Sequence, residues 1–233
     1  MDRSSRVTDA TATPSARGSL SREKVLRAAV EMADAAGGEV PSTRRLAERL
    51  GVRAMALYHH FKNKDELLDG MVDLVFAEIE LPEEGADWRT GMLRRAASMR
   101  EALRRHPWAI GLMDSRANAG PATLRHHDAV LGCLRRGGFT VAGAAHAFSL
   151  VDSYVYGFAV QEHALPFDSG DDLEPVVEVM MEQAPPEEFA QRFPYLAEIA
   201  VEHALKPGYD YGEEFAIGLG LIVDGLERRR EEW

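Results

Sequence analysis

The sequence is short of the features that mark secreted, membrane-spanning or disulfide-bonded proteins. Its 233 residues include one cysteine, Cys133, which excludes an intramolecular disulfide and any cysteine-cluster metal site. No apolar run approaches the roughly 18 residues of a membrane span. Residues 1–19 lack the apolar region of an export signal. We therefore expect a flexible tail over 1–19, on a protein of the reducing cytoplasm.

Basic residues are fewer than acidic ones, and they are unevenly placed. The chain has 27 Lys and Arg against 38 Asp and Glu, a net charge of −11 that normally argues against a nucleic-acid partner. Residues 1–69 nevertheless hold 12 basic and 10 acidic residues, which leaves −13 for the remainder. Residues 43–64 contain six basic residues and a single acidic one, Glu48. This asymmetry indicates a basic head on an acidic body.

Strand-like alternation and internal repeats are absent, whereas apolar residues recur at helical spacing along the chain. With 45% apolar residues the chain can bury a real core, and we predict an all-α fold. Residues 165–191 carry eight acids, no base and four prolines, which favours a mobile or partly helical connection. The expected helices cover residues 21–36, 43–50, 54–61, 64–80, 88–105, 108–115, 122–136, 141–165, 193–205 and 211–230.

The stretch TRRLAERLGVRAMALYHHFKNK, at residues 43–64, has the form of a helix-turn-helix, in which Ser42 or Thr43 would cap the first helix. Ala47 is small enough for the second helix to cross closely over the first, and Gly51 tolerates the left-handed backbone of a tight turn. The second helix is of a size that enters a DNA major groove. The residues expected to face outward, or to follow that helix toward phosphate, are Ala54, Met55, Ala56, Tyr58, His59, His60, Lys62 and Lys64.

At these residues the chain resembles the tetracycline-repressor (TetR) family of transcriptional regulators. The resemblance is carried by LAERLGV at residues 46–52, by ALYHHFKNKDELLD at residues 56–69, and by the helix that begins at Ser21. Three later segments resemble the C-terminal domain of the tetracycline repressor itself, so that the likeness extends over residues 20–230. These segments are DWRTGMLRRAASMREALRRHP, VDSYVYGFAVQEHA and EEFAIGLGLIVDGLERR.

The resemblance implies a domain order and a way of working. Residues 20–64 would form a three-helix DNA-binding domain, and residues 65–233 a larger helical domain for effector binding and dimerisation. The protein would be a homodimeric repressor, not an enzyme, that binds a palindromic double-stranded operator and is released by a small molecule, with helix 64–80 as the transmitting element. No cofactor, resident metal or membrane partner is expected. The DNA contacts implied by position are Thr43, Arg44, Arg53, Ala54, Met55, Ala56, Tyr58, His59, His60, Lys62 and Lys64.

Two departures from the family pattern affect what the protein would recognise. Arg53 and Ala54 supply no capping oxygen where family members often carry a hydroxyl or amide residue, so Arg53 is expected on phosphate. Met113 falls where the tetracycline-binding member has a metal-coordinating histidine, and Arg95 where it has an asparagine. Both changes argue against a metal–tetracycline effector. A differently shaped ligand, carboxylate-bearing or aromatic, is expected instead from Arg95, Met99, Trp108, Met113, Tyr154 and Phe158. The effector pocket is expected at Arg95, Met99, Trp108, Met113, Arg116, Tyr154, Phe158 and Glu162.

Glycines in the last expected helix require an explanation, because each costs roughly 1 kcal/mol of helix stability relative to alanine. Close approach of another helix would offset that cost, either within the chain or across a dimer interface. The four-helix dimer bundle of the family favours the interface. The interface residues expected on this basis are Val151, Val155, Gly218, Leu221, Ile222 and Gly225.

Several residues admit a plainer interpretation. His59 and His60 are adjacent on a helix and diverge by about 100°, so they cannot chelate one metal, and exposure or partial packing is favoured. An all-α enzyme would recruit His126, His127 and Asp128, with Glu162 and His163, but no His-Glu-x-x-His spacing is present, and at least one of the first three is expected to be exposed. Cys133 is expected in the core. The methionines and aromatic residues of the body fit a core as well as a pocket wall, and an activator or effector-independent regulator of the same fold remains an alternative.

Overall fold

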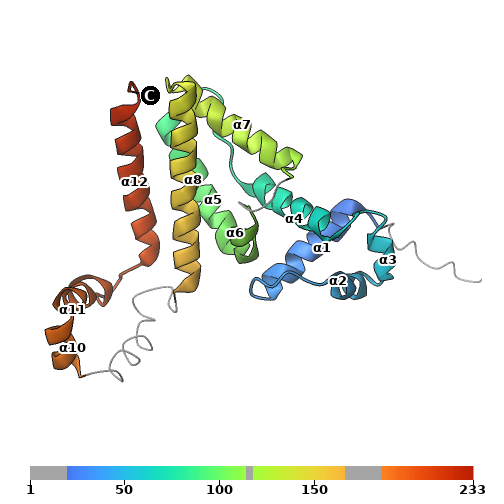
Figure 1. Ribbon diagram of the computed structural model, residues 1–233, viewed down its shortest axis with the longest axis horizontal. Coiled ribbons are helices and arrows are strands. Elements are labelled where there is room, and N and C mark those ends of the chain that lie inside the picture. Colours follow the sequence, from blue (N-terminus) through green and yellow to red (C-terminus); the bar gives the residue numbers. More distant parts are fainter. Residues whose placement is uncertain (1–19, 114–117, 166–184, 233) are drawn as a thin grey trace, which may run out of the picture.

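The computed structural model describes residues 20–113, 118–165 and 185–232. Within these ranges every regular element is a helix, as the apolar periodicity predicts (Figure 1). Arg116 and most of the acidic connection lie outside the described residues. The helices are α1 (Arg22–Ala35), α2 (Thr43–Leu50), α3 (Ala54–Leu57), α4 (Lys64–Glu78), α5 (Trp88–Arg105), α6 (Pro107–Met113), α7 (Pro121–Arg136), α8 (Val141–Ala164), α10 (Pro186–Arg192), α11 (Pro194–Ile199), η2 (Ala200–Ala204) and α12 (Tyr211–Arg229).

The head consists of α1, α2 and α3, and local signals fix where its helices begin and end. The Ser21 hydroxyl accepts a hydrogen bond from the Lys24 amide, and the Ser42 hydroxyl accepts one from the Arg45 amide, so Ser42 rather than Thr43 caps α2. Gly51 closes α2 at a φ of +67°, a backbone conformation that glycine adopts without strain. The capped, glycine-ended α2 is therefore placed by its own sequence.

The recognition helix is shorter than predicted. We expect a helix over 54–61, but α3 ends at Leu57, and residues 58–60 form a turn. Arg53 makes no side-chain capping bond at the start of α3, so the helix lacks the stabilisation that α2 receives. The amides of His60 and Phe61 both donate to the Leu57 carbonyl, and Phe61 is buried. The buried phenyl ring thus holds the end of α3 in place, at the position where the sequence predicts a longer helix.

The body is a bundle in which α8 packs against α5, α7 and α12. Figure 1 shows α8 and α12 side by side, and α4 running from the head into the body. α4 packs on α1 at one end and on α7 and α6 toward the other. One hydrophobic cluster extends from Val25 and Leu46 in the head to Val223 and Leu226 in α12. Head and body therefore share a core, with α4 between them.

The segment before α12 differs from its prediction. One helix is expected over 193–205, whereas the structure has α11, then the π-helix η2, with α10 preceding them. Pro194 lacks an amide hydrogen, and Phe193 adopts φ −132° and ψ +61°, so the chain breaks at Phe193 and a new helix starts. These short helices pack on one another and project from the bundle (Figure 1). Pro186–Arg192 shows that the described end of the acidic connection is helical.

Candidate functional site

The first candidate site is the outward surface of α2. Leu46 and Ala47 are buried, and Arg44, Arg45 and Arg49 are exposed. The Arg44 side chain is 87% exposed and pairs with Glu48 at 3.0 Å, the one acid of this stretch. An exposed pair of this kind contributes little to stability, so exchanging its carboxylate for a phosphate costs little. The surface is free to meet an anion.

Fewer side chains of α3 and the turn after it are exposed than the sequence predicts. Met55 is 71% exposed and Tyr58 is 47% exposed, whereas Ala54, Ala56 and His60 are half-buried. Beside them, Arg53, His59, Lys62 and Lys64 are exposed, and Thr43 is half-buried at the start of α2. The outward face therefore centres on one methionine and one tyrosine, with basic residues on both sides.

A clamp that the sequence analysis missed holds this surface in place. Arg22 of α1 pairs with Glu66 of α4 at 2.9 Å and donates to the His60 carbonyl at 3.1 Å, with its guanidinium 4.5 Å from the centre of the Phe61 ring. Glu66 also accepts a hydrogen bond from the Lys62 amide, and this bond, followed by Arg22, lowers the pKa of Glu66. The clamp fixes the end of α3 relative to α1 and α4. No local sequence signal joins residues 44 positions apart.

A second cluster joins head to body around His106, which is buried between α5 and α6. Its Nδ1 lies 2.8 Å from Asp34 of α1, and its Nε2 lies 3.2 Å from Glu78 at the end of α4. Asp34 also accepts a hydrogen bond from the indole of Trp108 at 2.7 Å, and Glu78 accepts one from Arg105 at 2.8 Å. Burial acts to raise the pKa of Glu78, but hydrogen bonds from Arg105 and His106 outweigh it and lower that pKa. The His106 imidazole, at the corner between α5 and α6, thus contacts both α1 and α4.

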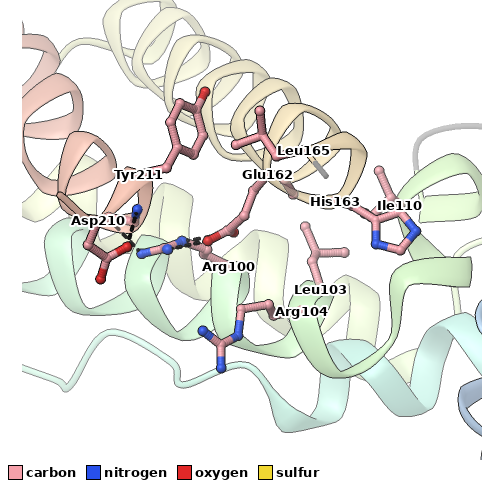
Figure 2. A pocket seen from close by; sticks show the side chains of 11 residues that line it. Arg100, Leu103, Arg104, Ile110, Glu162, His163, Leu165, Asp210 and Tyr211 are labelled. Atoms are coloured by element: carbon pink, nitrogen blue, oxygen red, sulfur yellow. Dashed lines mark hydrogen bonds and ion pairs between the residues drawn. The ribbon is translucent and has the colours of Figure 1, made fainter. Parts of the chain in front are cut away.

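The body contains a cavity of about 560 Å³ between α5, α6, α8 and the start of α12 (Figure 2). Arg100 spans it, pairing with Glu162 and donating to the Gly212 carbonyl at 3.1 Å. The hydrogen bond from Arg100 to Glu162 raises the pKa of Arg100. The lining residues are Arg100, Leu103, Arg104, Ile110, Ala159, Glu162, His163, Leu165, Asp210, Tyr211 and Gly212.

The residues predicted for the effector pocket are dispersed in the structure. Glu162 lines the cavity, and Phe158 stacks on the lining residue Tyr211 with ring centres 5.0 Å apart. Tyr154 stacks in turn on Phe215 of α12. The remaining predictions do not line this cavity: Trp108 lies at the head–body junction, Arg95, Met99 and Met113 are buried in the core, and Arg116 lies outside the described residues.

The predicted dimer surface needs correction at two positions. Val151 and Val155 have no exposed surface within a single chain, because α8 turns them toward its neighbours in the bundle. These two valines therefore have no exposed surface that a second copy could bury. Ile222 and Gly225 are half-buried and Leu221 is 67% exposed. Gly218 has a role inside the chain, since a Cβ there would overlap the Tyr154 hydroxyl, which donates to the Phe215 carbonyl at 3.1 Å.

The plainer interpretations of the histidines and of Cys133 can be compared with the burial of these residues. No group of three or more His, Cys, Asp and Glu in the part of the chain that is described could hold a metal ion. His126 is buried, His127 is half-buried and Asp128 is exposed, as expected for at least one of the three. Cys133 is buried in the core, as predicted. None of the helices within the described ranges is long and apolar enough to cross a membrane.

Fold and site together define a class: a helix-turn-helix DNA-binding protein whose short reading helices are attached to a larger helical body. The family model for bacterial regulatory proteins of the tetR family matches residues 25–71, and the model for the tetracyclin repressor-like C-terminal domain matches residues 81–230. The chain belongs to the TetR family of transcriptional regulators. Members of this family are DNA-binding regulators rather than enzymes.

Individual relatives agree with this assignment. The chain is 32% identical to the class A tetracycline repressor protein from transposon 1721 of Escherichia coli, over 91% of this chain and 92% of that one. It is 40% identical to an HTH-type transcriptional regulator of Saccharopolyspora erythraea, over 59% of each chain. Among solved structures, the TetR family protein ActR of Streptomyces coelicolor, in complex with (S)-DNPA, superposes with a TM-score of 0.71 at 27% identity, covering 91% of this chain and 100% of ActR.

Proposed function

We propose that this protein is a homodimeric repressor that binds a palindromic operator through α2 and α3 of each chain and is released when a small molecule occupies the body. The observation that carries the proposal is the exposed α2–turn–α3 wedge, held by the Gly51 turn and the Arg22–Glu66 clamp. It lies within residues 43–64, which hold six basic residues and one acidic one in a chain of net charge −11. The residues proposed to contact DNA are Thr43, Arg44, Arg53, Ala54, Met55, Ala56, Tyr58, His59, His60, Lys62 and Lys64.

The proposed dimer forms on the open face of α8 and α12. Leu221 is 67% exposed, Ile217 59% and Val160 53%, and these residues stand among small ones such as Gly157 and Ala216. A broad exposed apolar surface of this kind is typical of an interaction site. A second copy packed on it would give a symmetric assembly, and two wedges about 34–36 Å apart would enter successive major-groove turns. Residues 20–64 would then act as the DNA-binding domain and residues 65–233 as the domain for dimerisation and effector binding.

We place the effector in the body, with the α5–α8–α12 cavity as its entrance. Its wall combines Tyr211, which stacks on Phe158 behind it, with the charges of Arg100 and Glu162. Flat aromatic molecules with polar oxygens fit such a wall. The ActR complex with (S)-DNPA shows that a family member of the same fold takes up a small molecule. Aromatic effectors therefore form the first group to screen.

The signal would pass through α4, because α4 lies between the shared core of the body and the head. His106 gives the route a specific contact, touching Asp34 of α1 and Glu78 of α4 at once. A ligand that moves α5 or α6 would shift this contact. Coupling of roughly 1–3 kcal/mol is sufficient to change operator affinity 5- to 150-fold. A regulator that binds chromosomal DNA in this way would work in the cytoplasm.

The proposal is tested by selecting bound duplexes from a random DNA pool with the full-length protein, followed by a gel-shift assay on the winning sequence. A palindromic site bound by two chains, and released by at least one member of an aromatic compound library, is the expected result. Selection of no site, or of a site without dyad symmetry, would contradict it. Transcription from the selected site in vitro separates a repressor from an activator, since a repressor lowers it.

A further inference from the structure

A buried polar cluster in the body has hydrogen-bond donors with nothing to bind. Arg95 of α5 and His126 of α7 are both 0% exposed. Arg95 Nε donates to His126 Nε2 at 3.0 Å, and Arg95 also pairs with Asp152 of α8. Two nitrogens of the cluster, Arg95 Nη2 and His126 Nδ1, have no partner. Unpaired buried polar atoms are rare because each costs about 1–3 kcal/mol, so this pair calls for an occupant.

The chemistry of the cluster decides what the occupant must offer. A guanidinium can only donate, so His126 Nε2 accepts and the proton of the neutral ring lies on Nδ1. Burial, followed by the charges of Arg95 and His127, lowers the pKa of His126 to about 3, which keeps the ring neutral. Both unpartnered atoms are therefore donors. Because Nε2 faces Arg95, the Nδ1–H bond of His126 points away from the guanidinium, so each donor needs an acceptor of its own.

Charge narrows the choice further. The positive charge of Arg95 is already balanced by Asp152, and His126 is neutral, so the cluster carries no net charge. A second buried anion would be left without a full counter-charge, which is costly away from water. A neutral oxygen acceptor, such as a ketone, quinone or amide carbonyl, meets the donors without that cost.

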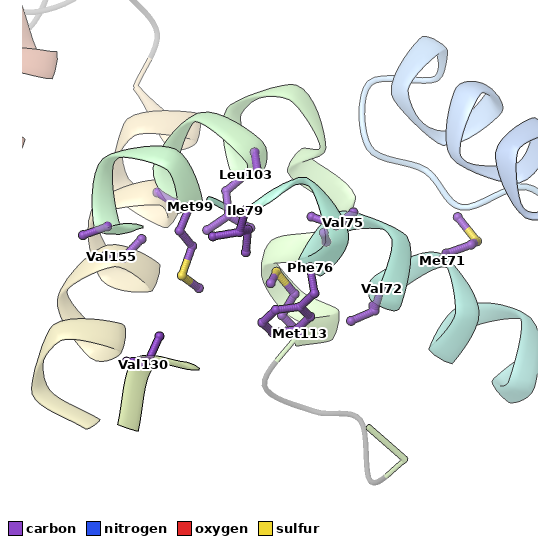
Figure 3. Packing of buried hydrophobic residues seen from close by; sticks show 14 of the residues in the cluster. Met71, Val72, Val75, Phe76, Ile79, Met99, Leu103, Met113, Val130 and Val155 are labelled. Carbon is purple, nitrogen blue, oxygen red and sulfur yellow. The ribbon is translucent and has the colours of Figure 1, made fainter. Parts of the chain in front are cut away.

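The surroundings favour a flat ligand and connect it to the head. The His126 ring packs 5.2 Å from Phe76 of α4, and Phe148 lies 5.9 Å from the Arg95 guanidinium. Figure 3 shows Met113 beside Phe76, and Met99 belongs to the same buried cluster. Methionine side chains repack readily, so they can yield space to a ligand. An occupant touching His126 would also be felt by α4.

We propose that Arg95 Nη2 and His126 Nδ1 form a buried effector subsite in which each nitrogen can donate to a neutral acceptor oxygen, such as a carbonyl, of an aromatic ligand. This inference rests on the proposed ligand response and names the class of effector. It also explains why Arg95, fully buried and ion-paired, retains one free nitrogen. A permanently trapped water is the competing occupant, and it would leave the protein indifferent to carbonyl compounds.

The test begins with the ring proton. Long-range ¹H–¹⁵N spectra of the full-length protein labelled with [¹⁵N]histidine, assigned with His126→Gln, should show His126 as the neutral Nδ1–H form. A proton on Nε2, or a charged ring near pH 7, would overturn the proposal, since the free atom would then not be the donor described.

The second arm uses three probes of matching outline: 2-acetylnaphthalene, 2-isopropenylnaphthalene, in which the carbonyl oxygen is replaced by CH₂, and 2-naphthoate. The ketone should bind the protein at least about tenfold more tightly than the other two, because it alone offers a neutral acceptor to a donor that otherwise stays unpaired. Equal binding, tighter binding of the carboxylate, or no binding of the ketone would overturn the subsite.

Variants localise the effect. Arg95→Lys keeps the charge opposite Asp152 but removes the free nitrogen, and His126→Leu removes the ring donor. At least one of the two substitutions should abolish the ketone preference, and its survival in both would overturn the subsite. The control His203→Gln alters an exposed histidine and should preserve the preference. If the ketone binds as described but never releases operator DNA, the proposed repressor mechanism fails while the subsite stands. If operator release is caused by ligands without an acceptor oxygen and is indifferent to Arg95→Lys, the subsite fails while the mechanism stands.

Discussion

The head and the body of this chain place an arginine in opposite environments, one exposed and one buried. In the head, Arg44 is almost fully exposed, and its i,i+4 partner Glu48 lies on the same surface. In the body, Arg95 has no exposed surface and is held by His126 and Asp152 from two other helices. The exposed arginine is free to meet a long polyanion, whereas the buried one can recognise only a small group that reaches it. In the proposed function, the same type of side chain would thus recognise DNA in one region and a small molecule in the other.

The largest effect is expected from a substitution in the body whose consequence is measured as operator binding by the head. Leu221→Glu places a charge on the open face of α12, where a second copy would have to bury it. We expect loss of the dimer and a fall of more than about 100-fold in operator affinity, although the reading wedge is untouched. Analytical ultracentrifugation and gel shift measure the two effects.

Leu124→Glu is the control for this change, since Leu124 is similarly exposed, at 58%, but lies on α7. It should preserve both the dimer and the operator affinity. If Leu221→Glu remains dimeric, the α8–α12 face is not the interface.

A change confined to the head should leave the body alone. Arg44→Ala is expected to weaken operator binding by about 10- to 100-fold and to reduce the slope of log affinity against log salt by about 1, because one phosphate contact is lost. Arg27→Ala provides the matched control: Arg27 is also exposed and also paired with a glutamate four residues away, but it lies on α1. Equal effects of the two substitutions would show that the α2 surface has no special role.

Acid should act on the body through His126. Its pKa of about 3 in the folded chain lies below the usual value near 6.5, so the unfolded chain takes up the proton first as the pH falls. Stability from this group is complete above pH 6.5 and is lost between pH 6.5 and 3, by about 2–3 kcal/mol at pH 4.5. Urea unfolding of the wild type against His126→Gln over this range measures the difference. The profile of His203→Gln should follow the wild type, and a flat difference would contradict a buried neutral ring.

The smallest expected effects are on the free energy of unfolding, and they come from Gly218 and Gly220, which lie in the same turn of α12. Gly218→Ala should lower the free energy of unfolding by about 1–3 kcal/mol, because the Tyr154 hydroxyl must move and give up its bonds to the Glu214 and Phe215 carbonyls. Gly220→Ala has room for a Cβ and should raise it by up to about 1 kcal/mol. Urea unfolding at several protein concentrations distinguishes these effects from a weakened dimer. Equal signs would refute the packing role given to Gly218.

The difference between the two regions also explains what the sequence could predict. Ser42, Gly51 and the apolar spacing of α2 act over a few residues, so the helix-turn-helix is visible in the chain itself. The cavity depends on Arg100, Glu162 and Tyr211, which meet only after three helices pack. Val151 and Val155 have the same apolar character whether they face a neighbouring helix or a second copy. Their sequence pattern therefore does not distinguish a core position from an interface position. The length of α3 depends on Phe61 finding its place against Arg22, another distant contact.

The shared core has a practical consequence for engineering. Because α4 packs on α1 and on the body alike, and because Asp34 and Glu78 both touch His106, the reading wedge cannot be exchanged as a free-standing cassette. A chimera that grafts another specificity onto this scaffold would have to keep α4 with its native neighbours and replace only the outward side chains of α2 and α3. A graft cut at the start of α4 would place a foreign surface opposite His106, and we expect such a chimera to lose the proposed response to an effector.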